Sequence, residues 1–367
     1  MNTFVVCGRT FSSKSPLIIA ELGTSHGAEL NRAKELIHAA AESGALCVKT
    51  QIVFADEILH PNTGTVELPG GPTPLYEVFK RLEMPFEFFA ECSRYAKEKG
   101  VLFLASAFGY KSAAILRALN TGFVKIASPE LNWLSFLKEF NSWGLPVLLS
   151  CGVSKLRDIE AALETLCAVP VCLLHCVTAY PAPAAEYNLS LLPHLNGIFG
   201  VPVGVSDHSI ESSIVPVLAL SQGACVIEKH FCISRSGDGL DDPIAQSAPE
   251  FAALCRDLNS VSALSPQEII DAAISSYGKA LVSACLGDGI KRLSKSEAEN
   301  YSRTNRSIHA LGTIKKGMRI EANSIAVLRT EKKLRPGLPP EFFEQIIGSR
   351  ASAEIPAGEG VRLEDLL

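Results

Sequence analysis

Several features of other protein classes are missing from this chain of 367 residues. None of its apolar runs reaches the roughly 20 residues that a membrane-spanning helix needs. Its first residues show no basic segment followed by a long apolar core and a small-residue cleavage site, so we expect no signal peptide. Positive charge is not in excess either, because the net charge is −5. This charge disfavours a general binder of nucleic acid or of anionic membranes, and any positive charge for an anionic substrate must be local.

Cysteines are present but unpaired in the sequence. The eleven cysteines are scattered singly, without a Cys-x-x-Cys pair, and Cys47, Cys172 and Cys225 lie inside apolar runs. This pattern favours buried, reduced thiols over a disulfide framework or a zinc site. We therefore expect a cytoplasmic protein.

Short apolar runs recur along the first two thirds of the chain. They are continuous rather than alternating, which is typical of parallel strands covered on both faces. Helix-like segments fill several of the gaps, at residues 32–44, 85–100, 155–167 and 212–223. The eight apolar runs are residues 16–23, 47–52, 101–108, 123–128, 146–152, 171–177, 201–208 and 225–231.

Eight strands alternating with helices predict an α/β fold, a (β/α)8 barrel of the TIM type. The alternative is a doubly wound open sheet. That fold would usually show fewer strands and a glycine-rich phosphate loop after the first of them. The stretch AELGTSHGAEL has no Gly-x-Gly-x-x-Gly spacing, so the barrel is favoured.

Polar residues end most of these strands. In a barrel the carboxyl ends of the strands meet at one rim, where active sites lie. His208 and His230 end the seventh and eighth strands, which are neighbours, so we expect the two imidazoles to reach one ion. The polar groups at strand ends are Glu21, Lys49 with Gln51, Ser106, Lys125 with Ser128, His175, Ser206-Asp207-His208, and Glu228 with His230.

The character of the chain changes after residue 285. Residues 286–303 are polar and charged and predict a linker helix. Residues 304–367 contain short β-like pieces broken by KKG and PAGEG turns, which predicts a small β-rich domain. A domain of roughly 60 residues has a limited core, so we expect it to dock on another surface. The barrel would span residues 1–285.

Taken together, these pieces resemble the sialic acid synthase family, which comprises N-acetylneuraminate synthases and their legionaminic and pseudaminic acid relatives. The resemblance covers nearly the whole chain, and the tail resembles the antifreeze-like SAF domain, a β-clip fold. It is carried by IIAELGTSHG, the VKTQ strand, ASAF, KIASPE, LHCVTAYPAP, GVSDHS, IEKHF, GLDD, IKKGMRIEANSIAVLRT and EIPAGEGVRLEDL.

The resemblance implies a reaction and its requirements. The family condenses phosphoenolpyruvate with an open-chain N-acetylated mannosamine-type sugar and water, giving a nine-carbon sialic (nonulosonic) acid and phosphate. A divalent metal ion is required, manganese in the first place, with magnesium and cobalt as alternatives. Family members are domain-swapped homodimers, in which the small domain of one chain covers the active site of the other.

Site residues follow from the same resemblance. The metal ligands would be His208 and His230, whose imidazoles suit manganese but also zinc and iron. The metal would polarise the sugar aldehyde as a Lewis acid. The catalytic residues would be Glu21, Lys49 and Glu228. The phosphoenolpyruvate site would comprise Lys49, Ser106, Lys125, Ser128, Thr178 and Ser206, and the sugar site Gln51, Tyr180, Asp241 and Arg329.

Glu228 and Asp207 are candidates for orienting the metal-binding imidazoles. Side chains two residues apart on a strand share a face, and adjacent ones do not. We therefore expect Glu228 to share the face of His230, and Asp207 to point away from that of His208.

The sequence departs from the family pattern at several places. Arg329 matches an arginine that reaches the partner's sugar site, but an insertion follows it, so that Arg335 is an alternative. Ser25-His26 replaces an Asn-His pair, and Thr178 replaces an asparagine. The acceptor therefore stays open among N-acetylmannosamine, its 6-phosphate and a 6-deoxy diacetamido sugar.

Three other functions compete with this interpretation. One is a Schiff-base aldolase with Lys125 as the nucleophile. Another is a relative that makes a 3-deoxy sugar acid phosphate, which the small tail domain and the GLDD loop argue against. The third is a non-catalytic ice- or glycan-binding protein, which the many charged residues of the tail disfavour.

Overall fold

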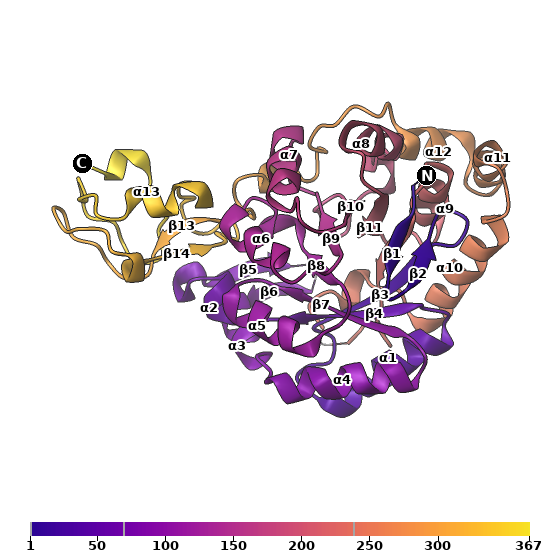
Figure 1. The fold of residues 1–367 in the computed structure, drawn as a ribbon, viewed down its shortest axis with the longest axis horizontal. Coiled ribbons are helices and arrows are strands. Elements are labelled where there is room, and N and C mark those ends of the chain that lie inside the picture. The colour runs from indigo at the N-terminus through magenta and orange to yellow at the C-terminus, as the bar shows by residue number, and fades with distance from the viewer. Residues whose placement is uncertain (1, 69, 238) are drawn as a thin grey trace.

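The computed structural model of the chain describes residues 2–68, 70–237 and 239–367. Eight parallel strands close into a barrel in the order β10-β11-β12-β3-β4-β7-β8-β9 (Figure 1). All eight predicted strands are confirmed, each to within two residues at either end. The strands are β3 (Leu17–Gly23), β4 (Cys47–Ile52), β7 (Leu102–Ala107), β8 (Val124–Ile126), β9 (Val147–Ser150), β10 (Val171–His175), β11 (Val203–Asp207) and β12 (Val226–His230).

Helices surround this barrel and confirm the predicted TIM-type fold (Figure 1). The four helices predicted from the sequence correspond to α1, α4, α7 and α9. The helices of this part are α1 (Leu30–Glu42), α2 (Ala55–Ile58), α3 (Leu75–Arg81), α4 (Phe86–Glu98), α5 (Tyr110–Leu119), α6 (Leu134–Asn141), α7 (Leu156–Thr165), α8 (Leu191–Phe199), α9 (Ile214–Ser221), α10 (Ala248–Val261), α11 (Pro266–Tyr277) and α12 (Lys279–Leu286).

An N-terminal hairpin, β1 (Phe4–Val6) with β2 (Arg9–Phe11), closes the amino-terminal end of the barrel. The side chains of Phe4 and Phe11 are buried against the first residues of the strands, such as Leu17. The sequence analysis did not predict this hairpin, because three-residue strands are too short to show a period. The hairpin therefore fills the amino-terminal end of the barrel, opposite the carboxyl ends of the strands.

The tail forms a second, smaller core beside the barrel, at the left of Figure 1. Strands β13 (Ser307–Ala310) and β14 (Ile325–Leu328) pair antiparallel, and a short helix α13 (Phe343–Ile346) packs with them. The predicted small β-rich tail domain is confirmed. Its core contains Ile308, Ala310, Ile314, Ile320, Ile325, Ile346, Ala351, Ile355 and Val361.

The predicted linker helix over residues 286–303 is wrong. Helix α12 ends at Leu286, and Gly287 and Gly289 follow with φ of 64° and 73°, which a right-handed helix does not tolerate. From there to residue 303 the only helical segment of the described chain is a 3-10 turn, Ala298–Asn300. Its polar side chains bind the backbone of the barrel loops instead of lying on a solvated helix face.

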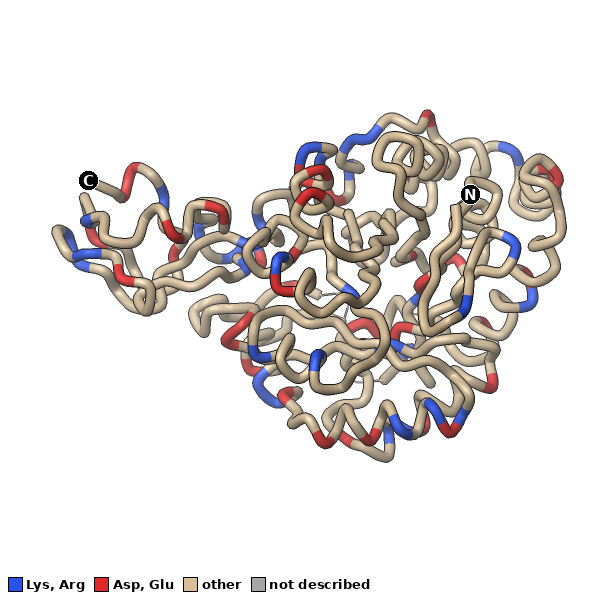
Figure 2. Tube along the Cα trace, in the orientation of Figure 1, with Lys and Arg blue, Asp and Glu red and all other residues tan. Residues whose placement is uncertain are grey.

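The surface has no strong bias of sign. Lysine and arginine residues are interspersed with aspartate and glutamate along the outer helices and the tail (Figure 2). Within the described part of the chain, no helix is both long and apolar enough to cross a membrane.

Candidate active site

A cavity of about 580 Å³ lies at the carboxyl ends of the barrel strands. This volume is in the range of small-molecule sites. All of the residues that the sequence analysis assigned to the site line it. They are Glu21, Lys49, Gln51, Ser106, Lys125, Ser128, Thr178, Tyr180, Ser206, His208, Glu228, His230, Asp241 and Arg329.

The parallel register of the barrel places these side chains next to one another. His230 on β12 lies opposite Glu21 on β3, and Glu21 lies opposite Lys49 on β4. On the next strands Ser106 lies opposite Lys125. Residues as far apart in the sequence as Glu21 and His230 therefore form a continuous row around the mouth.

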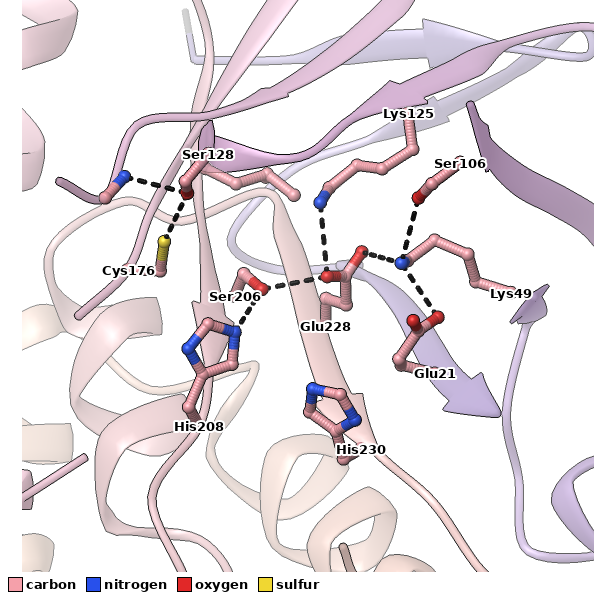
Figure 3. A network of polar contacts seen from close by, with 12 residues as sticks. Glu21, Lys49, Ser106, Lys125, Ser128, Cys176, Ser206, His208, Glu228 and His230 are labelled. Atoms are coloured by element: carbon pink, nitrogen blue, oxygen red, sulfur yellow. Dashed lines mark hydrogen bonds and ion pairs between the residues drawn. The ribbon is translucent and has the colours of Figure 1, made fainter. Parts of the chain in front are cut away.

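The floor of the cavity is a buried network of two lysines and two glutamates (Figure 3). Lys49 Nζ lies 2.8 Å from Glu21 Oε2 and 3.8 Å from Glu228 Oε2. Lys125 Nζ lies 3.3 Å from Glu228 Oε1. Each of these residues is at most 4% exposed. Because isolated charges are costly to bury, this mutual pairing is what keeps them charged inside the barrel.

The network shifts the pKa of its members in different directions. Burial acts against the charged form of Lys49, but Glu21 and Glu228 outweigh it and raise its pKa. Burial dominates at Lys125, and with the nearby Lys49 charge it lowers the pKa of Lys125. Burial would raise the pKa of Glu228, but Lys125, Lys49 and the Ser206 hydroxyl bring it down to about 2. Glu228 is therefore a carboxylate that holds both ammonium groups in place.

His208 and His230 face the cavity from β11 and β12 with ring centroids 5.6 Å apart (Figure 3). His208 Nδ1 lies 2.9 Å from the carbonyl oxygen of Val177, which makes Nδ1 the donor and leaves the Nε2 lone pair facing the cavity. Burial lowers the pKa of His208 to about 3, with a smaller effect from His230. A neutral imidazole oriented by a carbonyl is the form that binds metals.

These two rings fit a divalent ion of the first transition row. Among the described residues, no cluster of three or more His, Cys, Asp or Glu side chains has the geometry of a metal site. A two-imidazole site leaves coordination positions for water and substrate, as catalytic metal sites do. Asp241 Oδ2 lies 3.7 Å from His230 Nδ1, and Tyr180 stacks on His208 at 4.4 Å between centroids.

The serine side of the cavity lies around Ser128. Its Oγ accepts a hydrogen bond from the Gly152 amide at 3.0 Å and lies 3.0 Å from Cys176 Sγ (Figure 3). A Cβ at Gly152 would come within 2.2 Å of Thr178 Oγ1, so only glycine allows this close approach. Within the described structure, the hydroxyls of Thr178 and Ser150 have no hydrogen-bond partner. Buried hydroxyls of this kind are completed by a ligand or by water.

Ser150 was missed in the sequence analysis, although it lines the cavity. It ends β9, so the same strand-end rule that selected Ser106 and Ser206 applied to it as well.

Tail residues form one wall of the cavity. The guanidinium of Arg329 lies 2.5 Å from Glu130 Oε1, while the Arg329 amide donates to Ile58 O. Arg306 also contacts Glu130, at 2.9 Å, and both of those side chains are fully buried. The sequence analysis did not single out Glu130, because a glutamate beside a proline after a strand usually belongs to a surface turn.

The structure distinguishes the two candidate arginines. Arg335 lies within the tail, where its guanidinium donates to Gly360 O and pairs with Asp365. Arg329 lines the cavity of its own chain. The resemblance instead implies that the arginine at this place in the cavity comes from the partner chain.

A hairpin that the sequence analysis did not predict forms an apolar wall opposite the charged floor. It comprises β5 (Thr65–Leu68) and β6 (Gly71–Pro74) and precedes α3. The apolar residues that it brings to the cavity, together with their neighbours, are Val66, Leu68, Leu75, Phe79, Phe108 and Leu240.

Two polar strand-end residues lie outside the cavity. His175 Nε2 lies 2.6 Å from Tyr187 O, behind the strand. As predicted, Asp207 points away from His208, and its carboxylate pairs with Lys229 at 2.6 Å. The Lys229 ammonium also donates to Ser209 O and Glu211 O, so this pair anchors the loop after β11.

The fold and the site define a class, a (β/α)8 barrel with a charged, histidine-bearing cavity at the carboxyl ends of its strands, which is where enzymes of this fold carry their active sites. The sequence identifies it more closely. Residues 36–269 match the NeuB family, and residues 305–367 match the SAF domain. The chain belongs to the NeuB family.

Known relatives match over most of their length. The spore coat polysaccharide biosynthesis protein SpsE of Bacillus subtilis is 33% identical, covering 100% of this chain and 98% of the relative, and its crystal structure superposes with a TM-score of 0.81. An N,N'-diacetyllegionaminic acid synthase of Campylobacter jejuni is 30% identical over 95% of this chain and 99% of its own. An N-acetylneuraminic acid synthetase of Leptospira borgpetersenii has a TM-score of 0.65 at 27% identity, over 81% and 94% of the two chains.

Proposed function

We propose that this protein condenses phosphoenolpyruvate with N-acetylmannosamine, or a related N-acetylated mannosamine-type sugar, and water. The products are a nonulosonic acid of the sialic type and inorganic phosphate. Carbon 3 of phosphoenolpyruvate forms a bond to the aldehyde carbon of the open-chain sugar, water adds to carbon 2, and the bond from carbon 2 to the phosphate oxygen breaks. Membership in the NeuB family and the names of the relatives support this reaction.

One observation carries the proposal, the buried pair Lys49 and Lys125 on β4 and β8, the two strands that flank β7, in a negatively charged protein. Ammonium groups are compact charges that suit phosphate and carboxylate oxygens. The hydroxyls of Ser106, Ser128 and Ser206 lie beside them as further donors. We assign this side of the cavity to phosphoenolpyruvate.

The opposite side would bind the sugar. Glu21 accepts a hydrogen bond from Gln51 at 2.8 Å, which orients its carboxylate toward the space between the lysines and the histidines. From this place Glu21 would accept a proton from the water that adds to carbon 2, or orient the sugar hydroxyls. Tyr180, Asp241 and Arg329 line the outer part of the cavity and would bind the acceptor.

His208 and His230 would hold the divalent metal, which we propose to be manganese, with magnesium and cobalt as alternatives. When bound, the ion would supply Lewis acidity at the sugar aldehyde. Glu228, two residues before His230, would keep Lys49 and Lys125 in position.

We also propose that the protein works as a cytoplasmic homodimer. All eleven cysteines are free, and a reducing compartment keeps such thiols unpaired. A domain swap would preserve the contacts of the tail, because swapping exchanges identical elements between two copies. In such a dimer, Arg329 of one chain would lie in the cavity of the other chain. It would make the same contacts there that it makes in its own cavity in the single chain.

A 6-deoxy diacetamido sugar is the alternative acceptor. The apolar wall formed by Val66, Leu68 and Leu240 favours methyl groups over hydroxyl or phosphate groups at that end of the cavity. The relative named for diacetyllegionaminic acid supports the same acceptor class.

Phosphate release from phosphoenolpyruvate tests the proposal. The assay would use metal-loaded protein with N-acetylmannosamine, its 6-phosphate or a 6-deoxy diacetamido sugar, before and after chelation. Release that requires an acceptor and stops on chelation is the expected result, and the fastest acceptor identifies the substrate. Folded, metal-loaded protein that releases no phosphate with any of the three would contradict the proposal.

A further inference from the structure

The linker segment of residues 294–305 crosses the barrel mouth beside the serine side of the cavity. Glu297 is 1% exposed, and its Oε2 accepts two backbone hydrogen bonds, from Val153 at 3.1 Å and from Thr178 at 2.9 Å. These two residues belong to the loops that follow β9 and β10. A single linker carboxylate therefore joins two neighbouring barrel loops.

Two asparagines, one in the linker and one at the start of the tail, bind the carbonyl groups of the same two residues. Asn305 Nδ2 donates to Val153 O at 3.1 Å, and Asn300 Nδ2 donates to Thr178 O at 2.6 Å. Both backbone groups of Val153 and both of Thr178 are thus satisfied by Glu297 and the two asparagines. We call Glu297, Asn300 and Asn305 the linker clamp.

The clamp holds a backbone conformation that the barrel loop would not adopt by itself. Val153 has a φ of 41°, in the left-handed region that β-branched residues avoid. Such a conformation persists only where the surroundings determine it. Here the surroundings are the acceptor Glu297 and the donor Asn305. Without them, Val153 would relax toward negative φ and displace Gly152.

Gly152 connects the clamp to the cavity. Its amide donates to Ser128 Oγ, and its Cα lies so close to Thr178 Oγ1 that no side chain fits between them. Ser128 and Thr178 both line the phosphoenolpyruvate side of the cavity. A shift of the loop after β9 would therefore move the hydroxyl donors on that side of the cavity.

We propose that the linker clamp, through Glu297, is the positioning element of the phosphoenolpyruvate subsite, so that the subsite is complete only when the linker is docked on the barrel mouth. This inference rests on the proposed function, which assigns Ser128 and Thr178 to phosphoenolpyruvate. Glu297 itself acts through Val153 and Thr178 and is a positioning residue.

Binding of phosphoenolpyruvate to the full-length, manganese-loaded protein tests the proposal by titration calorimetry without an acceptor sugar. Glu297→Ala should weaken the affinity about tenfold or more, because two buried amides lose their acceptor. Glu297→Gln should weaken it only about threefold, because the amide oxygen still accepts from both. Glu299→Ala, at an exposed site two residues further on, is the matched control and should bind as the wild type does.

Two further readouts separate positioning from mere stability. Amide hydrogen exchange should accelerate in the peptides around Val153 and Thr178 in Glu297→Ala and should keep the wild-type rate in Glu299→Ala. If Glu297→Ala fails to fold, Glu297→Gln gives the same comparison. If both variants have lower melting temperatures but unchanged affinity for phosphoenolpyruvate, the positioning role of the clamp is wrong and the proposed function stands. Wild-type protein that binds no phosphoenolpyruvate would overturn the proposed function and the clamp with it.

Discussion

Lys125 is a cavity residue whose ammonium group pairs with Glu228. Burial lowers its pKa, and Glu228, 3.3 Å away, opposes that effect. We expect Lys125→Met, which keeps the apolar stem and removes the charge, to raise the KM for phosphoenolpyruvate at least about tenfold. Steady-state phosphate release measures this effect. Lys138→Met, at an exposed position of α6, is the control; equal KM values in both variants would contradict the assignment.

The same lysine distinguishes the condensation from a Schiff-base aldolase. A lowered pKa is also what an amine nucleophile needs. Under the proposed function, borohydride with pyruvate should leave Lys125 unmodified in a mass spectrum of the digested protein. A reduced pyruvyl adduct on Lys125 would favour the aldolase instead.

Gly152 is a second residue whose substitution should act on the cavity. An added Cβ would lie 2.2 Å from Thr178 Oγ1 and 2.6 Å from Cys176 Sγ, which forces the loop apart. We expect Gly152→Ala to lower the free energy of unfolding by about 1–3 kcal/mol and to weaken phosphoenolpyruvate binding in the protein that remains folded. Urea unfolding and titration calorimetry measure the two effects. Gly197→Ala in α8, where a Cβ meets nothing within 4 Å, is the control: it should leave phosphoenolpyruvate binding unchanged and raise the free energy of unfolding by up to about 1 kcal/mol.

At the residue scale, the sequence predicts those members of the site that end a strand. Glu228 and His230 illustrate the reason: strand periodicity puts both on one face, and the strand end puts that face at the mouth. Glu130, Glu297 and Asn300 could not be found this way. They lie on irregular segments, and their partners are backbone groups more than a hundred residues away or side chains of the tail.

At the element scale, β10 carries a buried histidine whose protonation should limit stability in acid. Burial, with a smaller effect from Lys291, lowers the pKa of His175 to about 3 from an ordinary value of 6.5. As the pH falls below 6.5, the unfolded chain therefore binds a proton that the folded chain does not. The contribution of His175 to stability is complete above pH 6.5 and is lost as the pH falls toward 3.

We expect His175→Gln to flatten the decline of unfolding free energy with acid by up to about 1.4 kcal/mol per pH unit. Urea unfolding at intervals between pH 8 and pH 4 measures this slope. From pH 7 to 8 the variant and the wild type should run in parallel. A variant that keeps the wild-type slope below pH 6 would show that His175 is not the group responsible.

Elements with a long apolar period were predictable, and short ones were not. The barrel strands and α1, α4, α7 and α9 follow from their hydrophobic patterns. The hairpin β5–β6 contains three prolines in the stretch from Leu68 to Pro74 and pairs over four residues only, so its sequence indicates a loop. The helix prediction for residues 286–303 is wrong for a different reason. The polar composition of this segment also suits a solvated helix, but its side chains bind backbone groups of the barrel loops.

At the scale of the whole molecule, the open question is which chain supplies Arg329 to each cavity. Arg329→Ala removes the arginine of the tail and leaves the barrel residues unchanged. Glu21→Gln removes a carboxylate of the barrel and leaves the tail unchanged. If the tails are swapped as proposed, the two inactive variants produced together should restore up to about a quarter of wild-type phosphate release, since half of the dimers are mixed and each has one complete site.

Each variant expressed alone should stay inactive, which serves as the control for this mixture. No recovery in mixed dimers verified by two different affinity tags would show that each chain uses its own arginine. Light scattering of the wild-type protein establishes the dimer independently.

The linker clamp also has a consequence for the order of synthesis. Thr178 precedes Glu297 by 119 residues, and Val153 precedes it by 144. At about 5–20 residues per second, a ribosome needs roughly 6–24 s to add the stretch between Thr178 and Glu297. The last barrel strand, β12, ends at His230, so in the later part of this interval the nascent barrel has all of its strands but not the acceptor that holds its loops. A chain stalled just short of Glu297 would therefore emerge as a folded barrel that binds phosphoenolpyruvate more weakly than the finished protein does.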